Sequence, residues 1–150
     1  MLFRSVLAVD LCILLKNSLS QIEIDKILYL AWVESEIIRD SAYKFIVQAF
    51  FHNSLLEETG DIFEQGKKIN IEKTLVALVN FFKDHGKQLF KIDYFVQGLW
   101  NKISAIRSFD SISNLLLKEN FANLLENDKI ILANFLISGT KYAAGLKDNV

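Results

Sequence analysis

The sequence predicts an all-α fold, and three observations favour it. The 150-residue chain has no proline and only six glycines, whereas many-stranded β folds need turn residues at short intervals. Hydrophobic residues make up 51% of the chain, which is enough for a sizeable core. They recur mostly at spacings of three and four residues, as in helices with one buried face. We therefore expect one domain over residues 1–150, built from about eight helices.

The first two helices are separated by polar residues. An apolar helix is expected over residues 3–17, and it ends at the polar pair Asn17-Ser18. Ser20 and Glu23, three positions later, form a capping box. In this motif the side chain of each residue accepts a hydrogen bond from the backbone N–H of the other. The helix that begins there is predicted to run to about Ile38.

The next two elements are shorter. Asp40 or Ser41 can cap a third helix, whose apolar residues end in the pair Phe50-Phe51. A segment from Leu55 to Phe63 follows, and it is expected to stop at Gly66.

The fifth helix has the clearest pattern. Asn70 is expected to cap it, and Gly86 is expected to end or bend it. Residues spaced four, three, four, three and four apart share its buried face. They are Ile71, Leu75, Leu78, Phe82, His85 and Leu89. The pattern therefore places one titratable ring on an apolar stripe near the helix end.

Three more helices are expected in the remainder of the chain. Their predicted bounds are 92–107, then Ile112 to Leu125 begun by Asp110 or Ser111, and finally Asn127 or Asp128 to about Gly145. No segment between them is long enough to divide domains, and no internal repeat is visible.

Composition and motifs exclude several function classes. With 17 basic and 18 acidic residues, the chain lacks the basic stripe of a nucleic-acid-binding protein. Metal motifs such as CxxC and HExxH, the nucleophile motif GxSxG and Gly-rich phosphate loops are all missing. We therefore expect no metal site, no catalytic residues and no enzyme activity. Cys12, the only cysteine, lies in an apolar run and is interpreted as a small core residue.

The N-terminal segment does not fit a targeting signal. Asp10 splits its apolar run, and no small-residue cleavage site follows. No stretch reaches 18 uncharged apolar residues, so we expect no membrane span and a cytoplasmic protein.

The chain has more aromatic residues than a small core needs, including 12 phenylalanines. Two uses of this surplus remain open. It can line an apolar pocket for an acyl chain or another long apolar ligand. It can also form a hydrophobic helix face that meets a second copy of the chain.

Several residues resemble positions of the globin fold. Trp32 lies where globins have a tryptophan in their first major helix, and His85 precedes Tyr94-Phe95 as a proximal histidine precedes the next long helix. The other matching residues are Leu30, Ala31, Phe45, Phe51, Asn53, Phe63, Leu99 and Trp100. The 22 positions from Phe63 to His85 leave no room for the helix that carries the distal residue in heme globins, so heme is not expected.

Length, helical pattern and composition look most like the plasmid-encoded sporulation-inhibitory proteins of anthrax bacilli, which are similar to the sensor domain of a sporulation histidine kinase. The resemblance implies a heme-free globin-like fold, a hydrophobic tunnel that holds a fatty acid, a nearby halide ion and a homodimer. It also implies inhibition of sporulation, because such a domain takes up the kinase's signal without having a kinase domain.

The surplus of aromatic residues and the family resemblance together indicate candidate binding residues. The expected apolar wall consists of Phe45, Phe50, Phe63, Leu78, Phe82, Phe95 and Leu99. A buried carboxylate head group needs a cation or a hydrogen-bond donor. The candidates for this contact are His85, Lys83, Arg39 and Tyr43.

Two other functions stay open. A ligand-free helical interaction module, of the viral apoptosis-inhibitor or bacteriocin-immunity type, would use its hydrophobic surface to bind a partner helix. A heme protein would depend on His85 alone, a residue that is otherwise a partly buried histidine near a helix end.

Overall fold

A computed structural model describes residues 2–51, 64–86, 91–118 and 124–148. Within these ranges the chain forms seven α-helices and several 3-10 turns, and it contains no strand. The prediction of an all-α protein is therefore confirmed. Contacts within the chain form two compact units, Met1–Asn53 and Ser54–Val150, each of which is described by itself. The prediction of one domain stays a prediction.

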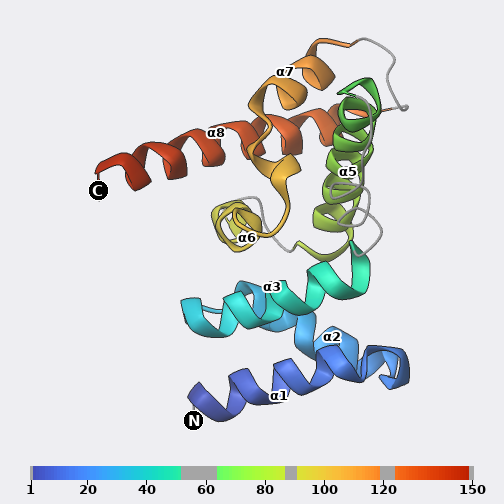
Figure 1. The fold of residues 1–150 in the computed structure, drawn as a ribbon, viewed down its shortest axis with the longest axis vertical. Coiled ribbons are helices and arrows are strands. Elements are labelled where there is room, and N and C mark those ends of the chain that lie inside the picture. The colour runs from blue at the N-terminus through green and yellow to red at the C-terminus, as the bar shows by residue number, and fades with distance from the viewer. Residues whose placement is uncertain (1, 52–63, 87–90, 119–123, 149–150) are drawn as a thin grey trace. The chain divides into compact units, whose positions relative to one another are not determined.

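The N-terminal unit contains three helices joined by 3-10 turns (Figure 1). Its elements are α1 (Leu2–Leu14), η1 (Lys16–Ser18), α2 (Gln21–Tyr29), η2 (Leu30–Trp32) and α3 (Glu36–Phe50). Helices α1 and α3 lie side by side and make the largest contact of this unit. Val9, Ile27 and Phe45 are buried at the centre of one core cluster, and Cys12 packs against it as predicted.

Local capping signals set the start of α2. The Ser20 hydroxyl accepts a hydrogen bond from the Glu23 N–H, and the Glu23 carboxylate accepts one from the Ser20 N–H at 2.7 Å. The predicted capping box is confirmed. Its hydrogen bonds with Ser20 lower the pKa of the Glu23 carboxyl below its usual value.

The helix predicted to reach Ile38 ends earlier, so this boundary is wrong. Val33 is extended, and α3 starts at Glu36 with Ser35 as its N-cap, ahead of the predicted caps Asp40 and Ser41. The early end of this helix results from a side-chain contact, which helix propensity does not take into account. The buried Arg39 guanidinium donates hydrogen bonds to the Val33 and Glu34 carbonyls at 2.9 and 2.6 Å, which holds the connection in a turn.

The C-terminal unit contains the four remaining described helices (Figure 1). They are α5 (Glu64–His85), α6 (Ile92–Leu99), α7 (Phe109–Leu117) and α8 (Glu126–Asp148), with a 3-10 turn, η4 (Ser104–Arg107), before α7. Helix α8 packs against α5, α6 and α7, and α5 also contacts η4.

Several predicted boundaries in this unit are wrong. Helix α5 begins at Glu64 and continues through Gly66 and Asn70, because one glycine costs only about 1 kcal/mol in a helix interior. It ends at His85, and the Gly86 N–H bonds to the Phe82 carbonyl, as expected for the helix end. The predicted short segment from Leu55 to Phe63 lies outside the described residues.

The helix predicted over 92–107 is divided. Helix α6 stops at Leu99, and Ile103 takes an extended conformation before η4. Ile103, Ala105 and Ile106 are all buried, so their burial against the rest of the unit outweighs continuation of the helix.

The last two helices start and end at other residues than predicted. Helix α7 begins after Ser108 and ends at Leu117, whereas the prediction placed its end at Leu125. Helix α8 starts at Glu126 and extends past Gly145 to Asp148.

Aromatic rings fill the core of the C-terminal unit. The Phe95 ring stacks on Phe81 and Phe135, with centroids 6.1 and 5.6 Å apart, and lies 5.4 Å from Phe82. Phe82 also meets Phe135 edge to face at 6.2 Å. The rings come from α5, α6 and α8, so this cluster joins three helices.

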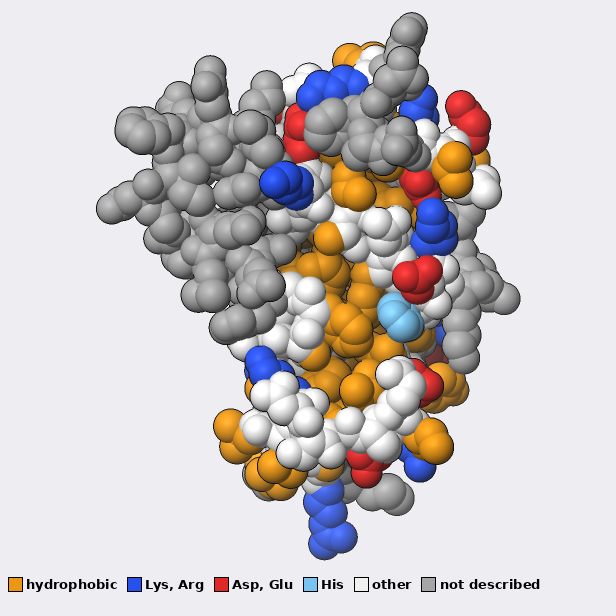
Figure 2. All heavy atoms as spheres, turned by 90° about the vertical axis from the view of Figure 1, so that its right-hand side faces the viewer, with side chains coloured by type: hydrophobic (Ala, Val, Ile, Leu, Met, Phe, Trp, Pro, Cys, Tyr) orange, Lys and Arg blue, Asp and Glu red, His pale blue; other side chains and the backbone are white. Residues whose placement is uncertain are grey.

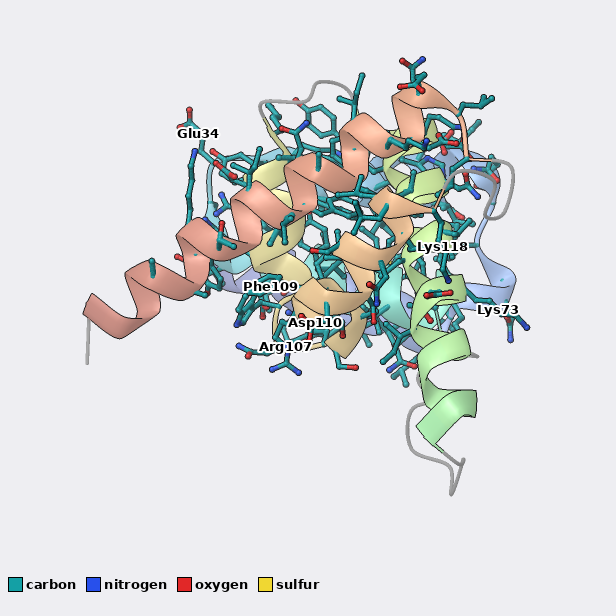
Figure 3. The ribbon with its side chains drawn as sticks, turned by 90° about the horizontal axis from the view of Figure 1, so that it is seen from above. Glu34, Lys73, Arg107, Phe109, Asp110 and Lys118 are labelled. Carbon is teal, nitrogen blue, oxygen red and sulfur yellow. The ribbon has the colours of Figure 1, made fainter. Side chains whose placement is uncertain are left out.

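Three polar contacts connect the helices around this core. Lys118, labelled beside α5 in Figure 3, pairs with the buried Glu72 of α5 at 3.1 Å. Lys83 of α5 pairs with Asp128 of α8 at 2.8 Å. The Ser138 hydroxyl of α8 donates to Asp93 of α6 at 2.5 Å. The two buried carboxylates among the described residues, Glu72 and Asp128, thus each have a lysine partner, as burial of charge requires.

Candidate functional site

A pocket of about 340 Å³ opens on the N-terminal unit. Its volume lies at the lower end of the range of small-molecule sites, roughly 300–1,000 Å³. Three elements of this unit contribute to its lining, which consists of Lys16 and Asn17 of η1, Ile24 of α2, and Phe45, Gln48, Ala49 and Phe50 of α3. Lys16 is the one charged residue among these seven.

Local structure explains how these residues come together. Phe45, Gln48 and Ala49 lie three and four positions apart, so they share one face of α3 near its C-terminus. The 3-10 turn η1 leads from α1 to the Ser20 cap and brings Lys16 to the same end of α3. There the Lys16 ammonium donates a hydrogen bond to the Gln48 carbonyl at 3.2 Å, in the last helical turn, where a cation is favourable.

The pocket has an apolar and a polar side. Phe45 is 1% exposed and Ile24 is half-buried, while the Phe50 side chain is 43% exposed. Lys16, Asn17 and Gln48 supply hydrogen-bond donors. This arrangement suits a ligand that has both an apolar part and a polar group.

Two of the seven predicted wall residues, Phe45 and Phe50, line this pocket. Phe82 and Phe95 contact each other in the aromatic core of the C-terminal unit, where Leu78 and Leu99 are also fully buried. Phe63 lies outside the described residues. A role of the four C-terminal residues in ligand binding stays a prediction.

Two head-group candidates belong to the core of the N-terminal unit. Arg39 uses its guanidinium to hold the turn before α3, through the Val33 and Glu34 carbonyls. Tyr43 is fully buried, and its ring meets Trp32 edge to face at 6.3 Å. Burial raises the pKa of Tyr43 far above its usual value although the charge of Arg39 lowers it, so the phenol keeps its proton at neutral pH.

The other two head-group candidates lie in the C-terminal unit. Lys83 forms the ion pair with Asp128. His85 is half-buried at the end of α5, and its ring packs on Phe81 with centroids 4.6 Å apart. The histidine drawn in pale blue in Figure 2 borders hydrophobic side chains, in agreement with this ring contact.

The sequence reasoning missed Lys16 as a site residue. It follows the apolar run of α1 and lies four positions before Ser20, the capping residue of α2. That position could have indicated a site residue, because a lysine in a short turn between two helices lies close to the ends of neighbouring helices. Only the packing of α3 on α1 shows which element it meets.

Helix α1 has a second apolar face in addition to the one in the core. Val9 and Ile13 pack toward the core cluster. Leu7, Leu11 and Leu14, spaced four and three residues apart, lie on the other side of the helix with about half or more of each side chain exposed. This row, continued by the exposed Leu15, is called the leucine face below.

No helix in the described ranges has the length and apolar character needed to cross a bilayer. In the same part of the chain, no three His, Cys, Asp or Glu side chains are grouped as a metal site requires. Comparison with protein-family models, curated proteins and solved structures gives no significant match to this chain.

Proposed function

We propose that this protein is a non-enzymatic binding domain for a fatty acid or a similar apolar signal molecule. The observation that carries the proposal is the pocket beside η1, where Phe45 and Phe50 form apolar wall and Lys16 supplies a positive charge. Each methylene that leaves water would contribute about 0.8 kcal/mol to binding. The cation satisfies the charge that a carboxylate head group brings with it.

The globin-like resemblance supplies the biological setting of this proposal. As a heme-less globin-like sensor domain, the protein would lower the free concentration of a signal that a sporulation histidine kinase detects. Such titration needs only affinity for the ligand, and no conformational signal. A cytoplasmic location, a homodimer and a halide ion near the ligand belong to the same proposal.

Extraction of the purified protein with organic solvent, followed by mass spectrometry, tests ligand binding. Ala49→Trp places a large side chain at the exposed pocket wall without changing charge. Ala77→Trp makes the same change at an exposed position of α5. We expect a fatty acid in the wild-type and Ala77→Trp samples, and several-fold less in Ala49→Trp. Absence of lipid from the wild type, together with no thermal shift on adding one, would contradict the proposal.

The leucine face favours a second function, that of a helical interaction module. Residues 7–14 span about 11 Å of α1, at 1.5 Å per residue, and Leu7, Leu11 and Leu14 form an exposed apolar row along it, with Asp10 beside the row. Covering one leucine fully contributes roughly 1.5–3 kcal/mol, so the row can stabilise a complex of two α1 helices from two copies of the chain. This use of the surface is compatible with ligand binding.

Light scattering measures the number of copies. Leu14 and Leu117 are both 80% exposed, so Leu14→Glu and Leu117→Glu form a matched pair. We expect a dimer for the wild type and Leu117→Glu, and a monomer for Leu14→Glu, because the glutamate would have to lose its hydration at the α1 contact. A wild-type monomer at micromolar concentration would exclude the dimer.

A further inference from the structure

Lys16 has an unusual environment for a lysine in a turn. It is half-buried and lines a pocket that has both polar and apolar walls. Its ammonium has three donors, of which the bond to the Gln48 carbonyl uses one. Among the described carboxylates none forms an ion pair with Lys16. The pocket therefore has a positive charge at its rim and hydrogen-bonding capacity that a ligand can use.

We infer that Lys16 binds the head group of a singly charged carboxylate whose alkyl chain enters the pocket for about eight carbons. This inference rests on the proposed function and makes it more specific, since it names the head-group residue and the ligand class. The carboxylate lies toward Lys16 and Asn17, and the chain lies along Phe45, Ile24 and Phe50. None of the four head-group candidates from the sequence occupies this position.

The volume of the pocket sets the length of chain that fits. One water takes about 30 Å³ in the liquid, a volume close to that of one heavy atom of an alkyl carboxylate with its hydrogens. The 340 Å³ of the pocket then correspond to about eleven such atoms. Two of them are carboxylate oxygens, which leaves room for eight or nine carbons. A longer chain would continue into solvent past the exposed Phe50 edge.

The charge of the pocket selects the head group. An alkyl ammonium would meet Lys16 with the same sign of charge. An alcohol of equal length would fill the apolar part but gain no ionic hydrogen bond. A second negative charge would find no further cation there, because Lys16 is the only charged residue among the described residues of the lining. The pocket is therefore matched to one negative charge and one chain.

Isothermal titration calorimetry of purified, delipidated protein with octanoate, 1-octanol and octylammonium tests this assignment. Octanoate should bind the wild type about tenfold more tightly than 1-octanol, and octylammonium should bind more weakly than either. In Lys16→Met the difference between octanoate and 1-octanol should disappear, and in Lys16→Arg it should remain. Lys26→Met removes an exposed lysine of α2 that does not line the pocket, so it should bind like the wild type.

A chain-length series tests the size of the pocket with the same measurement. Affinity should rise about fourfold per methylene from hexanoate to octanoate, the factor that corresponds to ~0.8 kcal/mol. It should rise much less between nonanoate and dodecanoate, because the added carbons lie outside.

The outcomes separate this inference from the proposed function. Equal binding of octanoate and 1-octanol by the wild type, or an unchanged octanoate preference in Lys16→Met, overturns the assignment of Lys16 and leaves lipid binding intact. Failure of the wild type to bind any of these compounds, together with no extracted lipid, overturns both. Circular dichroism checks that each variant folds. If Lys16→Met does not fold, loss of the octanoate preference in Lys16→Gln supports the assignment and its persistence there overturns it.

Discussion

The ion pair between Lys83 and Asp128 offers a precise test of how α5 and α8 are held together. The Asp128 side chain is 7% exposed and accepts two hydrogen bonds, from the Lys83 ammonium at 2.8 Å and from the Leu125 N–H at 3.1 Å. Asp128 is the third residue of α8, so its charge also lies at the favourable end of the helix dipole. The substitution Asp128→Asn removes this charge and keeps the size of the side chain.

The expected loss is moderate because Lys83 is 41% exposed and water weakens its attraction to the carboxylate. A charge at a helix N-terminus contributes about 0.3–1 kcal/mol, and an exposed ion pair contributes roughly 0.2–1 kcal/mol. We expect Asp128→Asn to lower the free energy of unfolding by about 0.5–2 kcal/mol at pH 7. For a chain of this size, each 1 kcal/mol lowers Tm by roughly 2–4 °C.

The pH dependence follows from the pKa of Asp128. Burial alone would raise this pKa, but the hydrogen bonds from Lys83 and Leu125 and the charge of Lys83 outweigh burial and lower it. A carboxyl whose folded-state pKa is lowered stabilises the protein above its unfolded-state pKa, about 3.9 for Asp. That stabilisation is lost as the pH falls through the folded-state pKa. The wild type and Asp128→Asn should therefore differ fully at pH 7 and much less at pH 3.

Urea unfolding followed by circular dichroism at both pH values measures this difference. Asp84→Asn changes an exposed aspartate of α5 and should alter the free energy of unfolding by less than about 0.5 kcal/mol. The double variant with Lys83→Met should lose less than the sum of the two single losses at pH 7. An equal difference at pH 3 and pH 7, or strict additivity in the double variant, would refute the reasoning.

Three further predictions concern stability and are measured by thermal unfolding. Gly139→Ala should destabilise by roughly 1–3 kcal/mol although alanine favours helices, because its Cβ would lie 2.8 Å from the Phe109 ring; Gly145→Ala, with open space around it, should stabilise by up to about 1 kcal/mol. The two substitutions should therefore change the free energy of unfolding in opposite directions, and equal changes would contradict the close packing of Phe109 on Gly139. Phe95→Ala should cost about 3–5 kcal/mol, since three rings lose their contact; a loss below 1 kcal/mol would mean that the cluster is not tightly packed. Arg39→Met should lower stability by about 1–3 kcal/mol without changing octanoate affinity, because two carbonyls lose their donor; reduced affinity at full stability would instead assign Arg39 to the ligand.

Features that depend on near neighbours in the chain could be predicted. The helical spacing of α5 placed Leu75, Leu78 and Phe82 on one face, and all three are buried. The capping box of Ser20 and Glu23 was predicted because its two hydrogen bonds join residues three positions apart. Such signals depend on local geometry, which the sequence specifies directly.

Features that depend on side-chain contacts and burial could not be predicted. The turn between α2 and α3 depends on the Arg39 side chain reaching back five and six positions to Glu34 and Val33, a contact that helix periodicity does not contain. The end of α6 depends on the burial of Ile103. The candidate pocket depends on the packing of α1 against α3, which brings Lys16 to Gln48, 32 positions later in the chain.

By itself, the sequence determined that this protein is helical, which faces of its helices are apolar, and where α2 begins, because periodicity and capping act within a few residues. The tertiary structure alone decided which apolar residues fill a core and which border a pocket. It placed Phe95 among other rings and Phe45 and Phe50 beside a lysine. The physical reason is that burial and ion pairing depend on distances between helices, and a one-dimensional pattern does not contain those distances.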